Sequence, residues 1–468
     1  TPLHHFFTAL PYRASMKIAR TLLFLLMTTA AFAQAPGEER AMGWVEAFNS
    51  GNPETMETFA QANYEPQMLA RRTAAERRSL FEQIHGKHGK LKVVGIDAGK
   101  GELRLMVEPE RGETLTLRFG IEPAPPHRIT GLGINIGGGP GGREDKLPPL
   151  ALSKDLPGSL DAYVRQLPDF GGTVLVAKNG EVLFEKSYGL ATRRWNVPNK
   201  NSTRYNIGSI TKDFTKVAIG QLAQAGKLAL DAPIVTYLPG YPNQDAAKKI
   251  TVQQLVDHTS GLGDVFTPRF FERNNAGFSK PQDFIDFFAS DPLKFAPGKG
   301  QAYSNYGYTV LGAIIEAVSG EPYFDYIQKH VFDPAGMSGS GFFDLRKPIA
   351  DIAIGHIHRD GEWLENTMAR PSLRGIPAGG SYSSARDLLA FDRTLRAGKL
   401  LDTKWTRWWF GGDPQTSSNV WAGGSPGVNA GVASDGTWTV IVLTNVDPPT
   451  GELLAEKVFE QAKVRIEN

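Results

Sequence analysis

The segment Tyr205-Asn-Ile-Gly-Ser-Ile-Thr-Lys212 is the stretch of this 468-residue sequence that points most directly to a fold. We expect a helix to begin near Ser209, with its hydroxyl beside the free backbone N–H groups of the first turn. Lys212 returns to the same helical face. If Lys212 is buried, its pKa falls and a neutral amine can accept the serine proton. Taken alone, the pair also fits an N-capping serine followed by a surface lysine.

A second segment supplies groups that a serine nucleophile needs. Tyr303-Ser-Asn305 places a phenol and an amide on neighbouring loop positions, 94 residues after Ser209. Acyl transfer requires a group that passes a proton to the leaving atom, and a tyrosine can do so. The same pattern occurs at Tyr241-Pro-Asn243, directly after Leu238-Pro-Gly240. That copy is typical of a turn, so we assign the chemistry to Tyr303 and Asn305.

From about residue 155 to 465 the chain resembles the class C β-lactamase and penicillin-binding-protein-like serine hydrolases. The matching segments follow the family order: Tyr205–Lys212, Thr251–Leu262 (Thr-Val-Gln-Gln-Leu-Val-Asp-His-Thr-Ser-Gly-Leu), Tyr303–Tyr308 and Gly379–Asp387. The resemblance implies that Ser209 is the acylated nucleophile and that Lys212 and Tyr303 share the acid–base work. It implies that Asn305 orients the substrate and the lysine. His258 is then structural.

The third motif of that family differs in this chain. The family carries Lys or His, a small residue and Gly on the strand that lines the cleft, whereas this chain has Trp421-Ala-Gly-Gly424. The resemblance therefore places Trp421 at the cationic position, and no histidine follows His358 to replace it. The N–H of Gly424 can still pair with that of Ser209 as an oxyanion hole. A cleft without this cation predicts a neutral acyl substrate, such as an ester, in preference to a β-lactam or another carboxylate.

Composition and spacing exclude several other kinds of site. The 51 basic and 49 acidic residues give a formal charge of +2, which predicts no nucleic-acid partner. The absence of cysteine excludes disulfides, thiolate metal sites and a cysteine nucleophile. The pairs His356/His358 and His85/His88 show no further ligand cluster, so we expect no metal and no cofactor.

A Gly-x-Ser-x-Gly match at Gly423–Gly427 imitates the nucleophile elbow of α/β-hydrolases. That mechanism uses the N–H of the residue after the serine, and Pro426 has none. Its histidine should also follow the serine, and none does. We therefore reject Ser425 as a nucleophile.

The N-terminus has the layout of an export signal. Residues 1–15 form an upstream extension before Met16, and residues 16–33 combine a basic start, an apolar run and the ending Ala31-Phe-Ala33. This order is that of a cleavable signal peptide, cut after Ala33. The sequence thus predicts a secreted or periplasmic protein. We expect no stable membrane span, because no other segment is apolar enough.

The mature chain is predicted to be a multi-domain α+β protein. Residues 38–136 read as helices followed by an antiparallel meander, an order similar to the cone-shaped nuclear-transport-factor-like domains. Residues 137–150 have the glycine and proline content of a linker. Residues 151–468 are predicted to form the hydrolase domain. We expect strands from both of its ends to pair in an antiparallel sheet flanked by helices, beside an all-helical lobe.

Two functions from different classes fit these patterns. The first is an active serine hydrolase that takes a small-molecule acyl substrate. The second is a binding or regulatory protein that kept the fold but lost efficient turnover, and Trp421 is the feature that suggests it. Because a pure binding module needs none of Ser209, Lys212 and Tyr303, we favour the enzyme.

Overall fold

The computed structural model of the chain describes residues 37–70, 72–99, 102–111, 115–122, 124–136, 147–272, 277–359, 361–366 and 372–466. The chain divides into two compact units between Gly142 and Arg143. The predicted extension (1–15), the signal peptide (16–33) and residues 137–146 of the predicted linker lie outside the described residues. Export and cleavage after Ala33 therefore stay predictions. Within the described ranges, no helix is long and apolar enough to cross a membrane.

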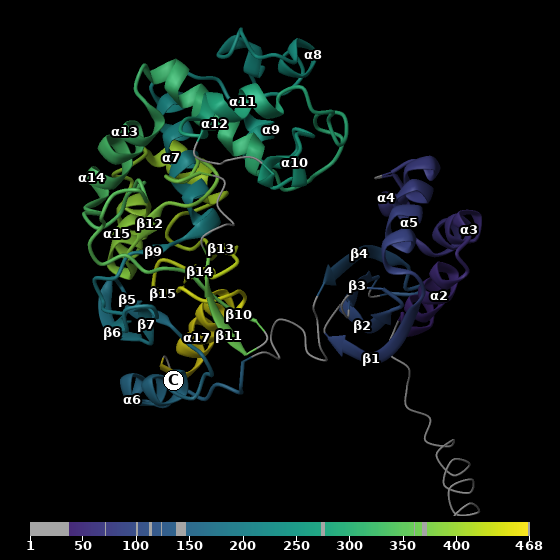
Figure 1. Ribbon diagram of the computed structural model, residues 1–468, viewed down its shortest axis with the longest axis horizontal. Coiled ribbons are helices and arrows are strands. Elements are labelled where there is room, and N and C mark those ends of the chain that lie inside the picture. The colour runs from purple at the N-terminus through teal and green to yellow at the C-terminus, as the bar shows by residue number, and fades with distance from the viewer. Residues whose placement is uncertain are drawn as a thin grey trace, which may run out of the picture. The chain divides into compact units, whose positions relative to one another are not determined.

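The N-terminal unit consists of helices followed by a four-stranded antiparallel meander, as predicted (Figure 1). Asn52 begins one helix by accepting the backbone N–H groups of Glu54 and Thr55, with Pro53 in the first turn. The elements are α2 (Glu38–Asn49), α3 (Pro53–Asn63), α4 (Pro66–Ala70), α5 (Ala74–His88), β1 (Leu91–Gly99), β2 (Glu102–Pro109), β3 (Leu115–Ile121) and β4 (Ile129–Ile136).

Apolar side chains at every second position of the strands form the core of this unit. Leu103, Leu105 and Val107 of β2 are almost fully buried, and so are the alternate residues of β3. They pack in one cluster with Trp44 and Phe48 of α2. Side chains at every second strand position face the helices, which explains the period of two in the sequence.

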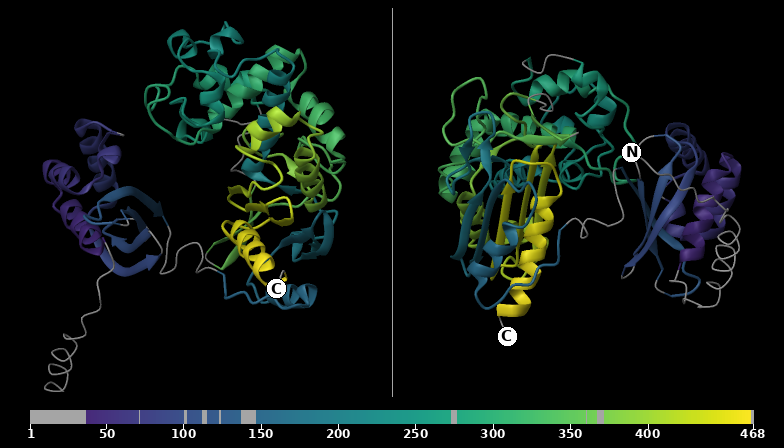
Figure 2. Two further views of the ribbon diagram at one scale, coloured as in Figure 1. Left: turned by 180° about the vertical axis from the view of Figure 1, so that it is seen from behind. Right: turned by 60° about the horizontal axis from the view of Figure 1, so that its bottom comes forward.

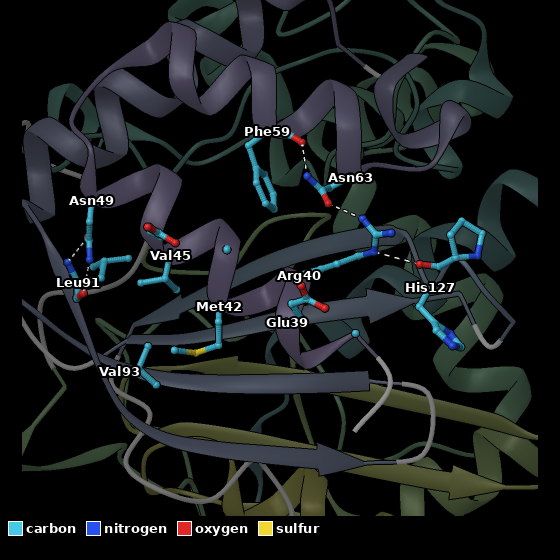
Figure 3. A pocket seen from close by; sticks show the side chains of 14 residues that line it. Glu39, Arg40, Met42, Val45, Asn49, Phe59, Asn63, Leu91, Val93 and His127 are labelled. Carbon is cyan, nitrogen blue, oxygen red and sulfur yellow. Dashed lines mark hydrogen bonds between the residues drawn. The ribbon is translucent and has the colours of Figure 1, made fainter. Parts of the chain in front are cut away.

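A groove of about 1030 Å³ lies along α2 in this unit (Figure 3). Arg40 crosses it, donating to the Asn63 side chain and to the carbonyl of Pro126. At its other end, the side chain of Asn49 exchanges two hydrogen bonds of 2.7 Å with the backbone of Leu91. These polar groups are engaged with one another and hold the helices to the strands.

The C-terminal unit is built on a five-stranded antiparallel sheet in the order β13-β14-β15-β5-β6. Strand β15 pairs with β5, with Val440 opposite Val176, so strands from both ends of the domain meet as predicted. The strands are β5 (Gly172–Lys178), β6 (Glu181–Tyr188), β13 (Asn419–Ser425), β14 (Val428–Ser434) and β15 (Trp438–Thr444).

Helices cover both faces of this sheet (Figure 2). Val174 and Val176 of β5 face a cluster with α6 (Leu156–Val164) and α17 (Thr450–Ile466). Leu175 and Ala177 face the opposite cluster. That second cluster contains residues of α7 (Thr211–Gln224), α15 (Ala385–Arg396) and α16 (Thr403–Phe410), and it continues into the helical lobe.

Short elements and the lobe complete the unit, and the α+β class with an all-helical lobe is confirmed. The lobe and its connections comprise η2 (Gly208–Ile210), η3 (Ile234–Thr236), α8 (Gln244–Ala247), α9 (Val252–Val256), α10 (Pro268–Phe271), α11 (Pro281–Phe288), α12 (Asn305–Ser319), α13 (Tyr323–Ile327), η5 (Gln328–Phe332) and α14 (Asp333–Ala335). The short strands are β7 (Leu190–Thr192), β8 (Val197–Pro198), β9 (Tyr205–Asn206), β10 (His356–Arg359), β11 (Glu362–Glu365) and β12 (Tyr382–Ser383).

Truncating the central strand should destabilise this unit strongly. Ile441 of β15 is fully buried, whereas Val420 on the edge strand β13 is 50% exposed. Ile441→Ala is expected to lower the free energy of unfolding by about 2–5 kcal/mol, since it leaves a cavity between sheet and helices. Val420→Ala should change it by less than about 0.5 kcal/mol. Urea denaturation followed by tryptophan fluorescence measures both, and equal losses would contradict this packing.

Candidate active site

Ser209 lies in the short 3₁₀ turn η2, immediately before α7. The expected helix start is therefore tighter than a regular first turn, and α7 proper begins at Thr211. The Thr211 hydroxyl binds the carbonyl of Gly208 at 2.7 Å and fixes this turn. Lys212 follows on α7, with its Nζ 3.3 Å from the Ser209 Oγ. The predicted pair is in contact.

The Lys212 ammonium is buried among oxygen atoms. The residue is 6% exposed. Its Nζ donates to Asn305 Oδ1 at 2.7 Å and to the carbonyl of Ala378, besides Ser209 Oγ. Burial lowers the pKa of Lys212 to about 7, against the opposing charges of Asp264 and Asp213. The alternative of a surface lysine beside a capping serine is thus wrong.

Tyr303 brings its hydroxyl to the other side of the serine. It donates a hydrogen bond of 2.5 Å to Ser209 Oγ. Burial of the hydroxyl end raises the pKa of Tyr303 to about 12, so the phenol keeps its proton at neutral pH. Lys212 Nζ lies 4.6 Å from the centre of the tyrosine ring. Serine, lysine and tyrosine therefore form one connected group.

Asn305 is the first residue of α12, which differs from the expected loop position. Ser304 caps this helix and accepts the backbone N–H of Gly307 at 2.9 Å. The helix start holds the Asn305 amide between Lys212 and a residue that the motifs did not single out, Asp264. Asp264 comes two residues after the Thr251–Leu262 segment, but the sequence gives no sign that it meets a residue 41 positions later.

His258 supports the tyrosine loop, in agreement with the structural role that the resemblance implies. Its ring lies 4.6 Å from that of Tyr303, and its Nδ1 accepts the backbone N–H of Ser304 at 3.2 Å. Burial lowers the pKa of His258 to about 4, so the ring is neutral and can accept this bond. Among the described residues, no group of three His, Asp or Glu side chains is placed to hold a metal ion.

The edge strand β13 approaches the serine turn backbone to backbone. A Cβ on Gly423 would lie 1.9 Å from the carbonyl oxygen of Ile207. Gly208 has a φ of +53°, and a Cβ there would lie 2.9 Å from the Gly424 nitrogen. Glycine is thus required on both sides of the contact. The backbone of Gly424 consequently lies next to the turn that carries Ser209.

Trp421 does not occupy the cleft position that we expected for it. It is 6% exposed, and its indole packs edge-on against Phe391 of α15 and Trp409 of α16, with ring centres 5.7 Å away in both cases. Val420 and Ala422 are exposed instead, because side chains alternate along β13. The large apolar ring gains more free energy in this aromatic cluster than at a wet cleft wall.

A cleft of about 270 Å³ opens onto Ser209, Tyr303 and Asn305. Its one formally charged lining residue among those described is Arg374, whose Nε binds the carbonyl of Phe342 and whose guanidinium lies over the Phe324 ring. The remaining described walls are backbone, small polar groups and the apolar side chains of Phe266, Leu345, Ile376, Tyr382 and Val428.

Comparison with known proteins assigns the domain. The model of the Beta-lactamase family matches residues 160–463. The chain belongs to the beta-lactamase family. Penicillin-binding protein 4* of Bacillus subtilis (strain 168) is 33% identical to this chain over 239 residues, which cover 48% of this chain and 52% of the relative. Esterase EstB of Burkholderia gladioli is 33% identical over 204 residues, which cover 41% of this chain and 52% of the esterase.

A solved structure gives the same result for the fold. The penicillin binding protein from Bacillus halodurans is 31% identical and has a TM-score of 0.56, covering 61% of this chain and 94% of its own. The chain spans between 52% and 59% of the length of the first three curated relatives. The resemblance to penicillin-binding-protein-like serine hydrolases is confirmed, and the family includes proteins named for different substrates.

The two motifs that we rejected as catalytic, Tyr241-Pro-Asn243 and Gly423–Gly427, have structural roles in this chain. Tyr241 is buried and its hydroxyl lies 2.9 Å from that of Tyr306, while Asn243 caps α8. Ser425 pairs with Val428 across a two-residue turn that joins β13 to β14. The Gly-x-Ser-x-Gly match is therefore a β-hairpin, without the strand-to-helix elbow.

Removing the Trp421 indole should cost stability. Trp421→Ala is expected to lower the free energy of unfolding by about 3–5 kcal/mol, because it empties the cluster with Phe391 and Trp409. Trp195, which is 66% exposed, provides the matched control, and Trp195→Ala should cost less than about 1 kcal/mol. Chemical denaturation measures both variants. A loss at Trp421 no greater than at Trp195 would place the indole outside the core.

Proposed function

We propose that this protein is a serine hydrolase that forms an acyl-enzyme at Ser209, on an ester or amide with an uncharged acyl group. The observation that carries the proposal is the environment of Lys212: a buried amine, with a pKa lowered to about 7, in hydrogen-bond contact with the serine hydroxyl. An unprotonated lysine in that position is a competent general base.

The partners of Lys212 favour one direction of proton transfer. A neutral amine has two N–H bonds and one lone pair. Asn305 Oδ1 and the Ala378 carbonyl can only accept, so they take the two N–H bonds. The lone pair is then left for the third neighbour, the Ser209 hydroxyl. Tyr303 already donates to Ser209 Oγ, so the serine proton is free to point to the lysine.

The proposed reaction conserves protons over two steps. Lys212 takes the proton of Ser209 as Oγ bonds to the substrate carbonyl carbon, and the backbone N–H groups of Ser209 and Gly424 bind the oxyanion. Tyr303 donates its proton to the leaving alkoxide or amine and regains one from the Lys212 ammonium. Water then attacks the acyl-enzyme with the same groups in reverse, which releases the acid and restores Ser209.

The cleft favours substrates without a carboxylate near the reacting carbonyl. Arg374 directs its guanidinium to Phe324 and Phe342, and the position that carries a cation in the resembled family has an indole that faces the core. Phe266, Leu345 and Val428 instead offer apolar surface. The likeness to a relative named as an esterase supports an ester as the substrate class.

The alternative of a binding or regulatory protein rests on Trp421 standing where the family carries Lys or His. The indole lies in the core beneath β13, so it does not block the cleft, although the cation of the motif is still missing. Meanwhile Ser209, Lys212 and Tyr303 are joined by hydrogen bonds that a binding module would not require.

Chemical labelling tests the nucleophile. Intact-mass spectrometry should show one adduct at Ser209 after exposure to a fluorophosphonate, together with hydrolysis of a short-chain p-nitrophenyl ester. Ser209→Ala should abolish both, and Lys212→Ala should lower the hydrolysis rate by at least about 10³-fold because the base is lost. Penicillin should give no lasting adduct. Folded wild-type protein that reacts with none of these reagents would refute the hydrolase assignment.

The pH dependence tests the base. Because burial lowers the pKa of Lys212 to about 7, the rate of fluorophosphonate labelling should rise about tenfold per pH unit below that value and level off above it. Tyr303 keeps its proton over this range. Tyr303→Phe should therefore lower the maximal labelling rate at high pH, while the pH at which the rate levels off stays near 7. A rate that is independent of pH between 5 and 9 would exclude Lys212 as the base.

A further inference from the structure

Asp264 holds Asn305 by three hydrogen bonds, two from its side-chain amide and one from its backbone N–H. The Asn305 Nδ2 lies 3.1 Å from both carboxylate oxygens of Asp264, and the Asn305 backbone N–H donates to Oδ2 at 3.1 Å. The Phe266 backbone N–H donates to Oδ1 at 3.1 Å. The carboxylate thus sits at the first turn of α12, where the helix dipole also favours a negative charge.

This contact decides which way the Asn305 amide faces. An ionised carboxylate has acceptors and no donor, so it binds the NH₂ end of the amide and rejects the oxygen end. The oxygen, Oδ1, is consequently turned to Lys212 Nζ, 2.7 Å away. With the amide reversed, its N–H would meet the lysine and attract the amine lone pair away from Ser209.

We propose that Asp264 is a positioning residue for the Lys212 base: by fixing the orientation of the Asn305 amide, it keeps the lysine lone pair directed at Ser209. The inference rests on the proposed function, because it concerns the efficiency of that base. Asp264 does not touch the serine; it acts through Asn305.

The surroundings of Lys212 give the direction of the accompanying electrostatic effect. Asp264 and Asp213 both raise the lysine pKa against the larger effect of burial. Removing the charge of Asp264 should therefore move the acid limb of the rate profile to lower pH while the rate itself falls. The titratable groups placed around the lysine are Asp213 on its own helix, Asp264, His258, Tyr303 and Tyr308.

The variant that tests this role is Asp264→Asn, which keeps the shape but lets the Asn305 amide take either orientation. We expect kcat/KM for the ester to fall by about 10- to 100-fold, mainly in kcat, as is usual for loss of a group that orients a functional residue. Asp257 is the matched control: it is exposed and bonds to Gln253, so Asp257→Asn should leave kcat/KM and the acid limb unchanged.

A double-mutant comparison with Asn305→Ala distinguishes a positioning role of Asp264 from a general loss of folding. In an Asn305→Ala background, Asp264→Asn should have no further effect on the plateau value of kcat/KM above the acid limb, because the group it orients is gone. An equal fall in both backgrounds, or no fall in the single variant, would overturn the proposal. Melting temperatures report folding. If Asp264→Asn is unstable, a comparison of Asp264→Glu with Asp264→Ala decides, since only the first still offers acceptors to the Asn305 NH₂ group and it should keep the higher kcat/KM.

A readout without turnover keeps this proposal distinct from the hydrolase assignment. In protein labelled with ¹⁵N-asparagine, the side-chain NH₂ pair of Asn305, identified by its absence from Asn305→Ala, should be slow to exchange with solvent. Asp264→Asn should accelerate that exchange and Asp257→Asn should not. Unchanged exchange would refute the positioning role even in an active enzyme. Protected exchange in a protein that does not react at Ser209 would refute the hydrolase instead.

Discussion

The burial of one amine, the Nζ of Lys212, is the constraint on which the site depends. Taking an ammonium group out of water is costly, and the protein offsets the cost by placing oxygen atoms of Ser209, Asn305 and Ala378 around it. The same burial lowers the lysine pKa to near neutrality. In the proposed mechanism, one arrangement serves both stability and reactivity, because the oxygens that stabilise the buried amine also direct its lone pair to Ser209.

These oxygens come from three parts of the chain, so the fold must hold them together. The sheet joins strands from both ends of the domain through the β5–β15 pair, and one aromatic and aliphatic cluster continues from the sheet through α7 into the helical lobe. The close approach of Gly423 to the Ile207 carbonyl then fixes β13 against the serine turn. Close-packed interiors resist displacement, so this packing positions β13 beside the serine turn.

The burial of Trp421 in the core determines which groups line the cleft. Trp421 occupies a position that carries a cation in related motifs, but its ring is taken into the cluster with Phe391 and Trp409. In the described part of the chain, the cleft around Ser209 is lined by glycine backbone, small polar groups, apolar side chains and one charged residue, Arg374. Asp264 bonds to Asn305 on the lobe side of the serine. In the proposed mechanism, the walls that would select the acyl group and the carboxylate that would orient the base therefore belong to different elements.

From the sequence alone, local spacing suggested the Ser209–Lys212 pair, and alternating hydrophobicity predicted the strands of the antiparallel sheet. The family resemblance, carried by motifs in the same order along the chain, implied the roles of Ser209, Lys212, Tyr303 and Asn305. Only the tertiary structure decided that Trp421 faces the core, that Asn305 begins a helix, and that Asp264 meets it. Which face of an edge strand is buried, and which distant carboxylate closes on an amide, depend on packing between segments far apart in sequence, and no local pattern records that packing.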